Sequence, residues 1–196
     1  TWGMKASSMI AKRAFQGAVP ALAALVVWAA MAPQRAQARA CLDYTAHPHM
    51  LGGADSPNIA RDVVVHGDYA YLSEGGDGLL IYDVSRPCHP VFKTKATSLA
   101  DRAVGVLEEY GDYILVSASR NSGYYKSILV LDLTTPLQPV IVGSLAVNSS
   151  PSSIKVVGTI AYVANGGGLS ILDVSDPRAL AVIGFLQCPG QAVDVA

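Results

Sequence analysis

An internal repeat of about 45 residues constrains what this chain can fold into more than any other feature of the sequence. Each copy has a glycine followed by an apolar run, at Gly67, Gly111 and Gly158. Each then reaches an apolar run that ends in aspartate, LLIYD at 79–83, ILVLD at 128–132 and LSILD at 169–173. Units of this length bury their apolar faces by stacking on their neighbours, so the chain is limited to an array of like units.

Four short strands are predicted in each unit. In the first copy they are Asp62–His66, Tyr69–Ser73, Leu79–Val84 and Val91–Ala96, separated by Gly67-Asp68, Gly75–Gly78 and Ser85–Pro87. These separators are turn signals. The third strand is apolar on both faces, so a neighbour covers each side of its sheet.

Four strands in a unit of this length make the blade of a β-propeller. The expected fold is therefore all-β, a propeller with about three four-stranded blades plus the start of a fourth. A β-sandwich is the alternative, although it leaves the repeated turns unexplained.

The repeated unit resembles the LVIVD repeat. The resemblance lies in Gly67-Asp68-Tyr69-Ala70-Tyr71-Leu72, in the glycine-rich turn and in the third strand with its Asp-Val-Ser-x-Pro ending, and it covers residues 61–196. It implies an exported or surface-attached β-propeller of bacterial or archaeal type, without a particular chemistry. The second unit departs from the pattern at Leu133-Thr134-Thr135, and the third has Leu180 where the others have proline.

The first forty residues have the order of a secretory signal peptide. Lys5, Lys12 and Arg13 precede an apolar stretch, Ala18–Ala32, and two A-x-A cleavage patterns follow at 36–38 and 38–40. The apolar stretch is shorter than the roughly 20 residues of a membrane span. We therefore expect a signal peptide at 4–40 and no membrane span after cleavage; an uncleaved anchor is the alternative.

The expected organisation follows from these parts. Residues 41–60 form a lead segment, and the repeats fill 61–196, at about 61–100, 101–148 and 149–190, with the next unit starting at 191–196. Export to the periplasm, the cell surface or the medium permits disulfides between Cys41, Cys88 and Cys188, but their odd number leaves the pairing open.

The two ends of the chain look arbitrary. Three residues precede the first methionine, Met4, and the last residues lie inside an apolar strand pattern, so we expect translation to start at Met4 and further repeats to follow. Three blades leave the end sheets open, and their apolar faces would favour self-association. The residues expected on such faces are Leu79, Ile81, Ile128, Val130, Leu169 and Ile171.

The polar residues point to binding rather than to a reaction. A net charge of −1 argues against nucleic acid, which requires a basic surface. A recurring aspartate, at Asp83, Asp132 and Asp173, precedes a turn and can accept hydrogen bonds from the backbone N–H groups of that turn. The turn Gly75–Gly78 offers too few oxygen ligands for a calcium site. We predict no catalytic residue, no cofactor-binding residue and no metal site.

The second unit carries five or six extra residues within Ser119–Ser127. Insertions in repeat arrays gather on one face, and Tyr and Arg are favoured in recognition surfaces. The candidate binding loop is Arg120, Tyr124, Tyr125 and Lys126. A longer hairpin whose tyrosines pack on their own blade is the alternative.

Together these features predict an exported, non-enzymatic β-propeller scaffold that binds a protein or a glycan. One alternative is a propeller enzyme, a hydrolase or oxidoreductase, with its site in the central channel. The other is a spacer with a purely structural role.

Overall fold

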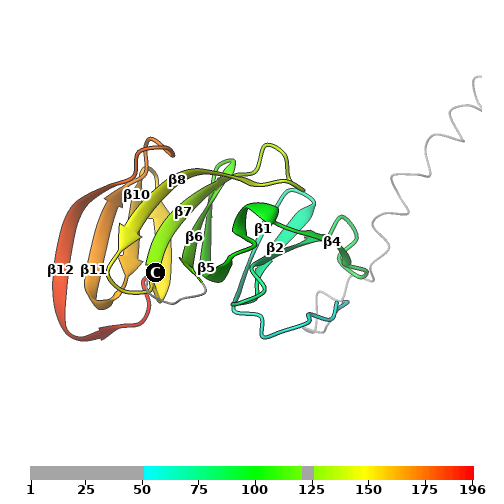
Figure 1. The fold of residues 1–196 in the computed structure, drawn as a ribbon, viewed down its shortest axis with the longest axis horizontal. Coiled ribbons are helices and arrows are strands. Elements are labelled where there is room, and N and C mark those ends of the chain that lie inside the picture. The colour runs from blue at the N-terminus through cyan, green and yellow to red at the C-terminus, as the bar shows by residue number, and fades with distance from the viewer. Residues whose placement is uncertain (1–50, 121–125) are drawn as a thin grey trace, which may run out of the picture. The chain divides into compact units, whose positions relative to one another are not determined.

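A computed structural model of the chain describes residues 51–120 and 126–196. The predicted signal peptide, Cys41, Tyr124 and Tyr125 lie outside the described residues. The described residues form three four-stranded antiparallel sheets and one short 3-10 helix, η2 (Thr97–Leu99) (Figure 1). Within these ranges no helix has the length and hydropathy needed to cross a membrane. The all-β fold of four-stranded repeats is therefore confirmed.

Each sheet is a simple meander in chain order. The first contains β1 (Asp62–His66), β2 (Tyr69–Ser73), β3 (Leu79–Asp83) and β4 (Val91–Lys95). The second contains β5 (Arg102–Tyr110), β6 (Tyr113–Arg120), β7 (Lys126–Asp132) and β8 (Val140–Val147). The third contains β9 (Ser153–Val157), β10 (Ile160–Ala164), β11 (Gly166–Asp173) and β12 (Ala181–Ala192).

A glycine at the first turn of every sheet sets the first hairpin. Gly67, Gly111 and Gly158 have φ of +58°, +58° and +62°, and among the described residues no non-glycine residue has a positive φ. His66 pairs directly with Tyr69, which leaves two residues in the loop. Glycine at the first of two loop positions is the requirement of a type II′ turn, whose twist matches that of the strands.

The recurring aspartates shape the turn after the third strand. Asp83 Oδ1 accepts the Ser85 backbone N–H at 3.0 Å, Asp132 Oδ1 accepts that of Thr134 at 2.8 Å, and Asp173 Oδ1 accepts that of Ser175 at 2.9 Å. The Ser85 hydroxyl, the Ser85 N–H and the Lys93 ammonium lower the pKa of Asp83 to about 2. The hydrogen bonds confirm the predicted turn role of these carboxylates.

The core lies between the sheets. Tyr71, Leu79 and Ile81 of the first sheet pack with residues of the second such as Val116 and Leu129. On the opposite face of the second sheet, Leu115 and Ile128 pack with Val163 and Leu172 of the third. The second sheet is thus buried on both faces, as its apolar strands predict.

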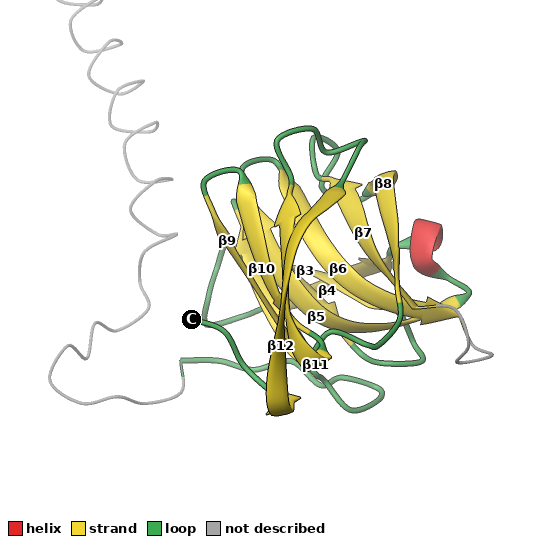
Figure 2. Ribbon diagram, turned by 90° about the vertical axis from the view of Figure 1, so that its left-hand side faces the viewer, coloured by secondary structure: helices red, strands yellow, loops and turns green. Residues whose placement is uncertain are grey.

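The prediction of open end faces was partly wrong. Leu79, Ile81, Ile128 and Val130 are buried, because these positions face the next sheet of the chain. Leu169 and Ile171 hold the equivalent positions in the third sheet, opposite the face that packs on the second, and they are half-buried. Beside them β12, nearest the viewer in Figure 2, exposes Val182, Ile183, Phe185 and Leu186.

A β-bulge recurs in the fourth strand of each sheet. The pairing skips one residue at Lys93, Val142 and Ile183, so that Thr94, Gly143 and Gly184 occupy equivalent positions. Over this region the proline turn of one repeat contacts the preceding sheet: the Tyr71 hydroxyl donates to the Pro136 carbonyl at 3.0 Å, and the Pro177 carbonyl lies against Gly143.

Candidate functional site

Antiparallel pairing gathers the starts of the first and third strands and the end of the second at one end of each sheet. At that end a hollow of about 300 Å³ lies among residues of all three repeats. Its hydrogen-bonding side chains are Arg61, Ser117, Ser119 and Ser150, and its apolar wall includes Ala103, Val104, Ala118 and Pro151. Sequence reasoning did not predict this hollow.

A backbone bridge between the first two sheets closes one side of the hollow. The Gly75 N–H donates to the Val104 carbonyl at 3.1 Å, and the Val104 N–H donates to the Gly75 carbonyl at 2.8 Å. Gly75 has φ of +53°, a conformation that side chains strongly disfavour. The glycine-rich turn thus serves a contact between sheets, which its composition alone did not reveal.

The same turn is held on its other side by Asp77. Asp77 Oδ2 accepts the Asn58 amide at 2.9 Å, and Asp77 Oδ1 lies 3.0 Å from Lys95 Nζ. These two partners lower the pKa of Asp77. Both carboxylate oxygens are therefore engaged by the protein, which agrees with a turn role for this segment.

A bulge in β5 lies directly next to this bridge and also lines the hollow. The pairing of β5 with β6 is interrupted between Val104 and Leu107, and the Ser117 hydroxyl accepts the Val106 N–H at 2.7 Å. A Cβ on Gly105 would lie only 2.7 Å from Ser117 Oγ. A side chain at this position would therefore displace the Ser117 hydroxyl from its hydrogen bond to Val106.

Arg61 supplies the charge of the hollow. It precedes β1 and is exposed, and its Nε would lie 3.1 Å from a Cβ placed on Gly75. Within the described ranges no carboxylate lies within 4.0 Å of its guanidinium. None of the residues that line the hollow is His, Asp, Glu or Cys.

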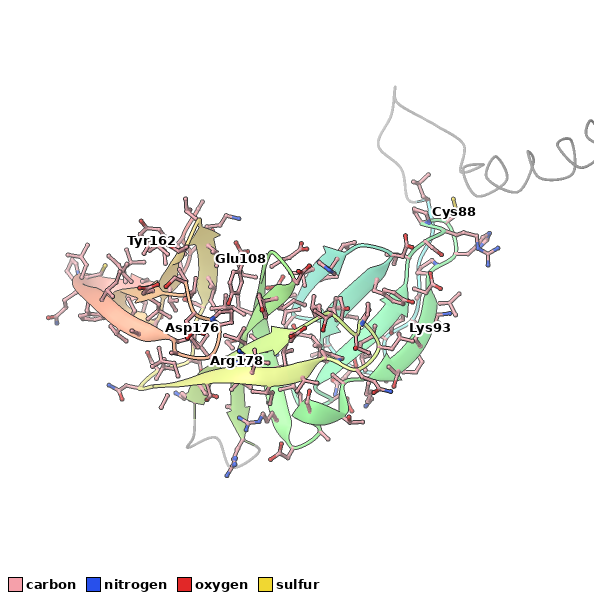
Figure 3. All side chains as sticks on the ribbon, turned by 90° about the horizontal axis from the view of Figure 1, so that it is seen from above. Cys88, Lys93, Glu108, Tyr162, Asp176 and Arg178 are labelled. Carbon is pink, nitrogen blue, oxygen red and sulfur yellow. The ribbon has the colours of Figure 1, made fainter. Side chains whose placement is uncertain are left out.

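Two carboxylates on the first strands of their sheets, those of Asp62 and Glu108, have structural partners instead. Asp62 Oδ2 accepts the Leu107 N–H at 2.8 Å. Glu108, labelled in Figure 3, accepts the Val156 N–H at 3.0 Å and lies 3.1 Å from Lys155 Nζ. Each carboxylate binds the first strand of the following repeat. Among the described residues no group of three or more His, Cys, Asp or Glu is placed to hold a metal ion.

The predicted binding loop lies at the same end as the hollow. Arg120 ends β6, Lys126 begins β7, and Lys126 pairs with Ser119, which lines the hollow. The extra residues lengthen this hairpin: β6 and β7 have 8 and 7 residues, against 5 each in β2 and β3. Arg120 Nε lies 4.0 Å from Asp101 Oδ2, whereas Tyr124 and Tyr125 lie outside the described residues.

Two findings come from comparison with known proteins. The family model described as LVIVD repeat matches residues 57–97 and 150–186, which contain the first sheet and most of the third. No curated protein matches the chain.

One similar solved structure is an S. cerevisiae complex of a Dbp5 variant bound to Nup159, a Gle1 variant, IP6 and ADP. The similarity has a TM-score of 0.43 at 14% identity and covers 69% of this chain and 32% of that chain. This chain thus spans about a third of that chain's length.

Proposed function

This chain is an LVIVD-repeat protein with a β-propeller-like scaffold, and on that premise we propose that it is exported and binds a protein or a glycan without catalysing a reaction. Binding takes place at the end of the sheets that carries the hollow and the lengthened β6–β7 hairpin. The partner lies on the cell surface, in the periplasm or outside the cell.

The lining of the hollow is the observation that carries this proposal. Three serines and one guanidinium offer hydrogen bonds to a ligand, and small apolar residues form the wall between them. Proton transfer in an enzyme generally uses His, Asp, Glu, Lys, Tyr or Cys, and none of these lines the hollow. A hydrolase or oxidoreductase with its site in the central channel of the propeller is the alternative.

Export is supported by the charged and apolar leader and by the state of one cysteine. Cys88 is disulfide-bonded, whereas Cys188 is a free thiol. Structural disulfides persist mainly in oxidising compartments. Since the leader lies outside the described residues, its cleavage is a prediction to be tested directly.

The test of binding is a panel of immobilised glycans and surface proteins probed with the full chain and with a variant whose hollow is blocked. Gly76 lines the hollow, and a Cβ there meets no atom within 4 Å, so Gly76→Phe adds bulk without a clash at Cβ. Gly190→Phe on β12 is the matched control, since a Cβ there also meets nothing.

We expect specific binding that Gly76→Phe abolishes and Gly190→Phe preserves. Absence of any binding, or binding that the two variants retain equally, would contradict the proposal. Release of a product from an immobilised glycan by the unmodified chain would favour the enzyme instead.

A further inference from the structure

We infer that the hollow accepts an acidic sugar, with Arg61 binding its carboxylate and the serines binding its hydroxyls. This inference rests on the proposed function and narrows the partner to a glycan that contains a hexuronate.

Arg61 places a positive charge at the hollow that no carboxylate of the described residues matches. A guanidinium has five donors in one plane and matches a carboxylate with two parallel hydrogen bonds. An anionic group on the ligand would supply the partner that the described protein does not.

The Arg61 side chain lies along the Gly75 turn. Its Nε and Nη2 would lie 3.1 and 3.7 Å from a Cβ on Gly75, so the guanidinium runs along a turn that has no side chain there. Gly75 is itself fixed by its two hydrogen bonds to Val104. The guanidinium thus lies beside the hollow, next to a turn that two hydrogen bonds hold against the second sheet.

The rest of the lining offers hydroxyls and apolar surface to a sugar. Ser119 and Ser150 have hydroxyls that make no hydrogen bond within the described residues, while the Ser117 hydroxyl already accepts the Val106 N–H. Free hydroxyls can both donate and accept, as the hydroxyls of a sugar do. Ala118 and Pro151 offer apolar surface to the C–H groups of a sugar ring.

The charge and the size of the hollow favour a ligand with one carboxylate on a single ring over a phosphate monoester or a peptide. A single guanidinium neutralises one carboxylate, whereas a phosphate monoester carries nearly two charges. A volume of about 300 Å³ is at the lower end for small-ligand sites, which suits one ring better than a folded peptide segment.

The experiment is calorimetric titration of the full chain with a glucuronate-terminated disaccharide, its methyl ester and the matching glucose disaccharide. We expect the free acid to bind about tenfold more tightly than the other two, the effect of one charge-assisted hydrogen-bonded pair. Arg61→Gln should lower affinity for the acid by about the same factor and leave the neutral sugars unchanged.

Two controls complete the experiment. Arg86→Gln removes an exposed arginine from the turn at the other end of the first sheet and should change nothing. N-acetyl-glutamate separates the sources of a carboxylate, and it should bind more weakly than the acidic disaccharide.

Equal affinity for the acid and its ester, an Arg61→Gln variant that binds like the unmodified chain, or tighter binding of N-acetyl-glutamate would each overturn the inference. If the chain binds neutral glycans through the hollow but not the acid, the inference fails and the proposed function stands. If the glycan and protein panel gives no binding at all, the proposed function fails as well.

Discussion

Replacing Gly143 by alanine tests whether the turn of one repeat sits directly on the preceding sheet. A Cβ at this position would overlap the Pro177 carbonyl oxygen and lie 3.1 Å from the carbonyl carbon and 3.3 Å from Val130 Cγ2. The obstacle is backbone of the next repeat, so it cannot rotate away as a side chain could. Either the turn or the β8 strand has to move.

The magnitude follows from the kind of clash. Inserting a methyl group into a closely packed contact costs typically about 1–3 kcal/mol of unfolding free energy. Gly184 occupies the same position after the bulge in the third sheet, and a Cβ there would lie 3.4 Å from Ile171 Cδ1, an ordinary contact. Gly184→Ala should therefore be neutral or stabilise by about 0.4–1 kcal/mol, through lower entropy of the unfolded chain.

Thermal unfolding followed by far-ultraviolet circular dichroism compares the two variants with the unmodified chain. For a domain of this size 1 kcal/mol shifts Tm by about 2–4 °C, so Gly143→Ala should lower Tm by about 2–12 °C. Gly184→Ala should leave Tm unchanged or raise it slightly. Equal shifts for both alanines, or no loss for Gly143→Ala, would refute the close contact between the Pro177 turn and β8.

Three further predictions concern acid, export and association. The hydrogen bonds from Ser85 lower the pKa of Asp83 from 3.8 to about 2, so the ionised carboxylate stabilises the folded chain above about pH 4 and this stabilisation is lost as the pH falls to about 2. Asp83→Asn should therefore make Tm fall less steeply with pH in this acid range. An unchanged dependence of Tm on pH would contradict this. N-terminal sequencing of the exported protein should begin at Arg39 or Cys41, and an intact leader after export would refute cleavage. The 196-residue chain should self-associate through β12, where the Phe185 side chain is 59% exposed, and light scattering should detect the larger species. Phe185→Lys should reduce this association. A monodisperse monomer of the unmodified chain would contradict the prediction.

The strands and turns within one repeat were predictable, because they depend on residues that are close together in the sequence. In the first repeat, alternating apolar residues bounded by Gly67-Asp68 and Gly75–Gly78 predicted strands that agree with β1 to β4 to within one residue. The aspartate turns were predictable for the same reason, because their hydrogen bonds join residues two apart.

Contacts between repeats were not predictable from these patterns. Alternation assigns Leu79 and Ile81 to one face of a strand, yet it does not say that this face meets the next sheet. The hollow depends on the bridge between Gly75 and Val104 and on the bulge at Gly105, neither of which leaves a periodic trace. The lengthened hairpin was predictable, because an insertion is visible in the spacing of the repeats, and it lies at the same end of the sheets as the hollow.

The Leu107 N–H donates to Asp62 and the Val156 N–H donates to Glu108, so each of these hydrogen bonds joins one repeat to the next. In both pairs the acceptor side chain belongs to the earlier repeat and the amide to the later one. Loss of the Asp62 carboxylate would therefore accelerate hydrogen exchange at the Leu107 amide in the second sheet, while the ladder between β1 and β2 keeps its own bonds. A substitution at Asp62 or Glu108 is thus felt in the repeat that follows, as well as in the repeat that carries it.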